Sequence, residues 1–178
     1  GREGWSDLLV NRAAIACILA YSFHCWELLG LWAWLPSFVV ESGPTGSGAG
    51  IGYGLGLAAL AHLVSSLGSL LGGRLADSLG SPLVMLLMSL ASLFCSFSLG
   101  WLVEGPAAVV FVMVLLYNLF AIGDSAVYSA AVAEVVPGHR LGAAYSIRSV
   151  LGFGAGAISP WVFGLVLDWA RATELSPG

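Results

Sequence analysis

Three ionisable side chains stand in the middle of strongly apolar stretches of this chain. Glu27 lies inside YSFHCWELLG, Asp124 inside LFAIGDSAVY and Arg148 inside AAYSIRSVLG. Charges in such surroundings are costly, so each is a candidate functional residue. A carboxylate in an apolar medium favours its neutral form, which suits it to carry a proton. We predict that Glu27 loads and releases a proton, with Asp124 as the second candidate. Arg148 is expected either to hold an anionic group of a solute or to neutralise Asp124.

Neighbouring polar side chains share helical faces with these charges. His24 lies one turn before Glu27, and Tyr117 and Tyr128 lie on the same face as Asp124. We therefore predict a pathway for solute and ions lined by His24, Glu27, Tyr117, Asp124, Tyr128 and Arg148. Two alternatives stay open: His24 forms only a hydrogen bond between helices, and the two tyrosines serve only packing.

Polar stripes on other apolar runs suggest which helices face a wet cavity. His62, Ser66 and Ser69 form one such stripe, whereas the run at 83–103 has only serines and Cys95. The pattern predicts that four helices converge on a cavity and that the helix at 83–103 is peripheral and faces lipid.

Composition defines the surroundings in which these helices fold. Of 178 residues, 58% are hydrophobic and only 9% are charged, against roughly 25% charged in a soluble domain. A bilayer-spanning helix needs about 20 apolar residues. We therefore predict an all-α, polytopic membrane bundle that forms a single membrane domain over residues 1–178. The five expected transmembrane helices are about 13–40, 51–71, 83–103, 107–136 and 141–168.

Several other classes of function have no support in the sequence. The chain has no lysine and a net charge of −4, so it has no basic stripe for nucleic acid. Its three cysteines lack metal-ligand spacing, and there is no phosphate-binding glycine loop. No serine is marked as an activated nucleophile. We expect no enzyme activity, no metal and no cofactor.

Arginine positions predict the orientation in the membrane. Arg2, Arg12, Arg74 and Arg140 fall on one side of the five spans, whereas only Arg171 falls on the other. Positive charge accumulates on the cytoplasmic side, so we expect a cytoplasmic amino terminus.

Small residues at four-residue spacing predict close packing between helices. The expected pairs are Gly52 with Gly56, Gly68 with Gly72, and Gly152 with Gly156.

The gap between the second and third runs, residues 72–82, reads GGRLADSLGSP. It resembles the signature loop of the major facilitator superfamily (MFS), which joins the second and third helices of a six-helix half on the cytoplasmic side. Gly73, Arg74, Asp77 and Gly80 match the motif, whereas Ser78 and the following residues stand where the family prefers basic side chains. The resemblance implies that the loop, and Asp77 above all, stabilises one access state and acts as a gate.

The resemblance extends over nearly the whole chain, as helices seven to eleven of the carboxy-terminal half in a bacterial branch of the family. It implies a secondary active transporter of a small organic solute, working by alternating access in the bacterial cytoplasmic (inner) membrane. We expect proton coupling. The expected partners are the solute, protons, the lipid bilayer and the missing amino-terminal six-helix half of the same protein. Two alternatives stay open: a non-transporting membrane scaffold or assembly subunit, and an intramembrane enzyme.

Overall fold

The computed structural model describes residues 11–42, 50–102 and 105–174. Within these residues the chain is helical and contains no β-strand. The elements are α2 (Arg12–Ser42), α3 (Gly50–Leu79), α4 (Ser81–Leu102), α5 (Ala107–Gly123), α6 (Ser125–Val135), the 3₁₀ helix η1 (Gly138–Arg140) and α7 (Leu141–Glu174). Five helical spans in this part of the chain are long and apolar enough to cross a membrane, which confirms the predicted fold class.

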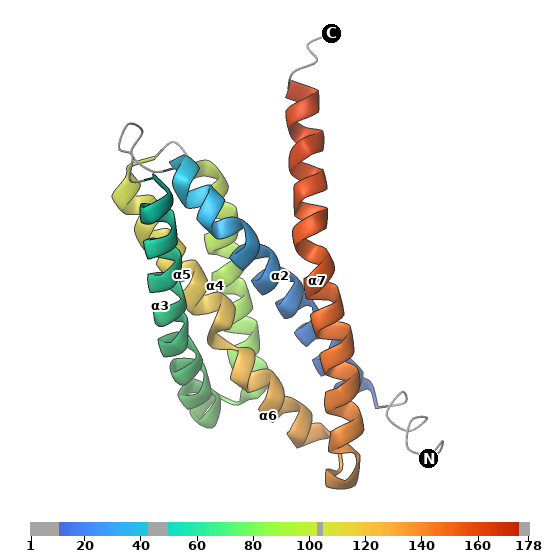
Figure 1. Cartoon of the computed structure of the whole chain (residues 1–178). Helices are drawn as coiled ribbons and strands as arrows, with labels where there is room; N and C mark the ends of the chain where they lie inside the picture. Colours follow the sequence, from blue (N-terminus) through green and yellow to red (C-terminus); the bar gives the residue numbers. More distant parts are fainter. Residues whose placement is uncertain (1–10, 43–49, 103–104, 175–178) are drawn as a thin grey trace.

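The helices run up and down between two ends of the bundle (Figure 1). The start of α2, the connection from α3 to α4 and η1 all lie at one end. The ends of α2 and α4 and the end of α7 lie at the other. The predicted alternation of sides along the chain is therefore seen for the described connections.

The stretch predicted as a loop at 72–82 is largely helical, which corrects its boundaries. Helix α3 continues through Gly73, Arg74 and Asp77 as far as Leu79. Gly80 then adopts a left-handed φ of +86°, and its N–H donates to the carbonyl of Ala76 at 2.9 Å. Glycine is favoured at this position after a helix because it has no Cβ to clash. A single residue therefore makes the turn into α4.

The fourth predicted span, 107–136, is interrupted at one of its candidate residues. Helix α5 ends at Gly123, and Asp124 has φ −93° and ψ −3° before α6 begins at Ser125. The interruption turns the backbone at the residue that carries the charge. The last predicted helix also extends further than expected, to Glu174.

Glycines bring the helices of two pairs into backbone contact. A Cβ at Gly72 would overlap the carbonyl group of Gly123, and one at Gly68 would overlap that of Leu119. A Cβ at Gly156 would lie 2.8 Å from the carbonyl oxygen of Cys25 on α2, and one at Gly152 would lie 2.6 Å from Cε1 of Tyr21. The predicted close packing is thus confirmed between α3 and α5 and between α2 and α7. For the third pair, Gly52 and Gly56, a Cβ would meet no described residue within 4 Å, so no close helix contact is seen there.

Helix α4 was predicted to be a peripheral helix that faces lipid, and one of its faces is apolar and exposed, with Leu90, Phe94 and Phe97 52–71% exposed, although it is not the least buried helix. The most hydrophobic window of α4 is 28% buried, whereas that of α7 is only 17% buried. One face of α4 packs against α5 and α6, and Ser92 is 2% exposed. Helix α7 rests mainly on α2, and its last turns stand away from the other helices (Figure 1). Ser92 thus lies on a packed face of α4, whereas Ser89 and Ser96 are exposed.

A buried amide ties three helices together. Asn118 of α5 is fully buried, and its Oδ1 accepts a hydrogen bond from Nε1 of Trp32 at 3.2 Å. Its backbone carbonyl accepts from the hydroxyl of Ser65 at 3.3 Å. Such bonds stabilise contacts between helices in an apolar medium.

Candidate functional site

The closest contact between ionisable side chains of the site joins α2 to the break between α5 and α6. Nδ1 of His24 lies 3.0 Å from Oδ1 of Asp124, and both side chains are 4% exposed. The structure gives this oxygen no other partner among the described residues. Oδ2 accepts a hydrogen bond from Ser89 at 3.4 Å. The imidazole therefore supplies the main partner of a carboxylate in the middle of the bundle.

Aromatic rings enclose this pair. Tyr128 lies one turn into α6, with its hydroxyl within hydrogen-bonding reach of Asp124 and Ser89. The rings of Tyr128 and His24 have centroids 5.2 Å apart, and Tyr21 stacks on His24 at 5.9 Å. The imidazole is thus held in a fixed orientation by contacts from two helices.

Glu27 lies one turn along α2 from His24 and is only partly buried. Its carboxylate is within hydrogen-bonding reach of Ser92 and Tyr117, and it interacts electrostatically with His24 and Asp124. Tyr117 in turn reaches Ser96. Glu27 therefore has hydroxyl partners but no paired cation of its own apart from the imidazole.

A cavity of about 480 Å³ brings most of the predicted site residues together. Its lining includes His24, Glu27, Tyr117, Asp124 and Tyr128, together with apolar side chains. The predicted pathway residues other than Arg148 therefore line one cavity.

The helix that completes this cavity was identified wrongly from the sequence. Ser89, Ser92 and Ser96 of α4 line it, whereas the predicted stripe on α3 does not. His62 instead packs edge-on against the ring of Trp32 at 4.7 Å. The spacing of the three serines, by three and four, places them on one helical face, and this was the signal available in the sequence.

Arg148 does not pair with Asp124, which corrects one of the two predicted roles. Its Nη1 donates to the hydroxyl of Ser129 at 2.8 Å. Its guanidinium carbon lies 4.1 Å from the centroid of the Tyr21 ring and 5.1 Å from that of Tyr145. Tyr21 thus contacts both Arg148 and the imidazole of His24, which lines the cavity.

The motif residues lie at one end of the bundle, away from the cavity. Arg74, Asp77 and Gly80 are exposed, and a Cβ at Gly73 would meet nothing within 4 Å. Asp77 makes no hydrogen bond or ion pair with the described residues. The turn is anchored instead by Ser81, whose hydroxyl donates to Glu134 of α6 at 2.7 Å.

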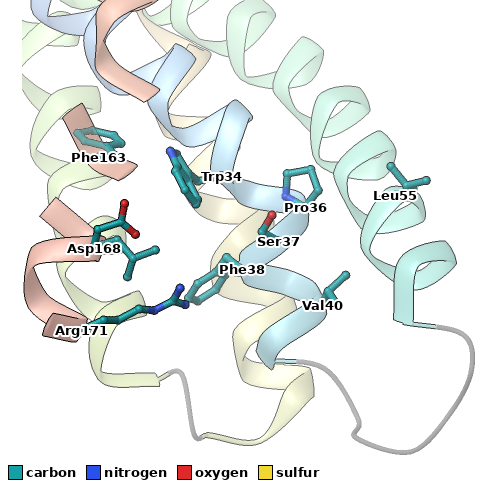
Figure 2. Close-up of a pocket in the computed structure, with 10 residues that line it drawn as sticks. Trp34, Pro36, Ser37, Phe38, Val40, Leu55, Phe163, Asp168 and Arg171 are labelled. Atoms are coloured by element: carbon teal, nitrogen blue, oxygen red, sulfur yellow. The ribbon is translucent and has the colours of Figure 1, made fainter. Parts of the chain in front are cut away.

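A second cavity, of about 830 Å³, opens where α2 and α7 diverge. Figure 2 shows the rings of Trp34 and Phe163 facing each other across it, with Asp168 and Arg171 from the last turns of α7 at its edge. Trp34 is fixed by a hydrogen bond from Nε1 to the carbonyl of Pro160 at 3.0 Å. No predicted site residue lines this cavity.

The side chains of the cluster are ones that can bind and exchange protons. No group of three or more His, Cys, Asp or Glu side chains among the described residues could hold a metal ion. A carboxylate beside an imidazole and phenols forms instead a chain of groups that exchange protons through short contacts.

Five apolar spans with ionisable groups buried between them are the features of an integral membrane protein. A family model described as Major Facilitator Superfamily matches residues 1–170. The chain belongs to this superfamily of secondary transporters, which is not an enzyme family. Comparisons with curated proteins and with solved structures gave no match.

Proposed function

We propose that this chain forms helices seven to eleven of the carboxy-terminal half of a bacterial MFS transporter that couples uptake of a small organic solute to protons. The cluster of His24, Glu27 and Asp124 carries this proposal. Both carboxylates line the cavity, but Glu27 is only partly buried, whereas the side chain of Asp124 is 4% exposed and contacts His24. Proton binding at Glu27 therefore changes the charge of the cavity while the second carboxylate stays paired.

In a transporter that works by alternating access, the charge of the cavity affects whether the cavity can close. A charged cavity in the membrane interior disfavours closure, because closure removes water from the charge. Protonation of Glu27 removes that cost and allows the loaded transporter to change its access state. Proton and solute then cross together.

Proton flux tests the function directly. The full-length protein is reconstituted into liposomes that contain a pH-sensitive dye, and candidate solutes are added outside without an imposed pH difference. We expect a transported solute to change the internal pH, and protein-free liposomes to show no change. Uptake of labelled solute without any proton movement would contradict the coupling, and a scaffold protein would give neither signal.

The motif at the end of α3 is proposed to be a cytoplasmic gate. Asp77 is exposed at the end of the bundle that also carries Arg12, Arg74 and Arg140. Its charge is available to a donor on the opposite half of the transporter. Labelling of a cysteine at Ser78 by an impermeant reagent outside intact cells would contradict the cytoplasmic position.

Asp77→Asn tests the gate. Loss of a charged hydrogen bond costs on the order of 1.5 kcal/mol, so we expect transport to slow by about tenfold. Solute affinity is expected to stay near the parent value, because Asp77 does not line the cavity. A large loss of affinity at an unchanged rate of exchange would assign Asp77 to the solute site instead.

A further inference from the structure

Arg148 is a cation within a membrane span that lacks an acidic partner. It lies seven residues into α7, about 10 Å along the helix at 1.5 Å per residue. Its only hydrogen bond goes from Nη1 to Ser129, and its Nε is buried and has no partner among the described residues. The two aromatic rings contact its faces and leave its edges unused.

The carboxylates near this part of the bundle contact side chains other than Arg148. Asp124 contacts His24 and Ser89. Glu27 lies among Ser92 and Tyr117, and Glu134 accepts the hydroxyl of Ser81. The positive charge of Arg148 is therefore uncompensated within the described residues, which is costly in a membrane.

Neighbouring contacts hold the guanidinium in one orientation. Tyr145 donates a hydrogen bond to the carbonyl of Ser129 at 2.9 Å, and the hydroxyl of Ser129 accepts Nη1 of Arg148. The edge formed by Nε and Nη2 has no acceptor among the described residues. Nε is buried and Arg148 lines neither of the two cavities described above, so a ligand reaches this edge only in another access state of the transporter. In that state the edge matches the two oxygens of a carboxylate, which accept in parallel from the two donors.

We propose that Arg148 binds the anionic group of the transported solute, and that the solute is a small organic acid. The inference rests on the proposed transport function and names its substrate class. The bound carboxylate neutralises the arginine, while a proton on Glu27 neutralises the cavity. With solute and proton bound, neither Arg148 nor the cavity beside Glu27 carries an uncompensated charge.

Thermal unfolding of the full-length protein in lipid-free detergent tests the inference. The probes are three acids and their neutral amides of the same shape: lactate and lactamide, benzoate and benzamide, succinate and succinamide. We expect at least one acid to raise the Tm by several degrees and its amide to leave it unchanged. Arg148→Gln is expected to remove the shift. Arg148→Lys is expected to keep part of it, because lysine retains the charge but not the paired donors.

Ser129→Ala provides a second variant if Arg148→Gln does not accumulate. This variant keeps Arg148 but removes the hydroxyl that accepts a hydrogen bond from its Nη1, so we expect the acid to bind several-fold more weakly. Equal shifts from acid and amide, equal shifts in parent and variant, or no shift from any acid would each overturn the inference.

A control with added lipid distinguishes binding of a solute from binding of a lipid headgroup at Arg148. Phosphatidylglycerol is added to the same detergent sample without acid. If only this lipid raises the Tm in an Arg148-dependent way, Arg148 pairs with a headgroup and the inference is wrong. Acid binding without solute-linked proton flux would contradict the coupling proposed above and leave the anion site standing.

Discussion

Glu27→Gln in the full-length protein is expected to abolish solute accumulation driven by a pH step, down to the level of protein-free liposomes. Glutamine keeps the size and hydrogen-bonding groups of the protonated glutamate, so contacts with Ser92 and Tyr117 persist. It cannot ionise, so no proton is released on the other side. Exchange of solute for solute down its own gradient is expected to continue.

The measurement is uptake of labelled solute into proteoliposomes with and without the pH step. Glu134→Gln is the matched control, because it makes the same change at an exposed carboxylate near the end of α6. This control is expected to accumulate solute as the parent does. If Glu27→Gln accumulates solute equally well, Glu27 is not the coupling residue and the paired Asp124 becomes the next candidate.

Asp124→Asn is expected to act differently from Glu27→Gln. The buried imidazole of His24 would lose the carboxylate that lies 3.0 Å away. Changing one member of a buried polar pair leaves the other poorly matched and is destabilising, so less folded protein is expected before transport is measured.

Gly72→Ala is expected to prevent normal packing of α3 on α5 and to reduce the yield of folded protein severely. The added Cβ would lie 2.7 Å from the carbonyl carbon of Gly123, and its collision with the carbonyl oxygen is closer still. Both partners are backbone, so no side chain can rotate away. Overpacking of this kind costs about 1–3 kcal/mol, and the collision occurs beside Asp124, so the site is displaced as well.

Gly56→Ala is the matched control on the same helix. A Cβ there meets nothing within 4 Å, and alanine is the better helix former by about 1 kcal/mol. We expect it to fold as the parent does or slightly better. The measurement is the fraction of monodisperse protein after detergent extraction, with its Tm. Equal yields from both variants would show that α3 and α5 do not approach as closely as described.

Local sequence determined the membrane-spanning segments of this protein. Long apolar runs must form helices in lipid, because only a helix satisfies its own backbone hydrogen bonds there. Glycine spacing also marked the two close contacts at Gly72 and Gly152 correctly. Helical periodicity placed Tyr117, Asp124 and Tyr128 on one face, and the structure has all three lining the cavity. These features depend on residues within a few turns of one another.

Tertiary packing decided which partners these residues have. His24 and Asp124 are 100 positions apart, and their contact depends on how α2 lies against the break between α5 and α6. The serines of α4 became part of the cavity, and His62 of α3 did not, because the rotation of each helix about its axis is fixed by its neighbours. Arg148 was assigned two possible roles from its sequence position. Only packing against Tyr21 and Ser129 separates it from Asp124, because an apolar run specifies that a helix spans the membrane but not which face meets which neighbour.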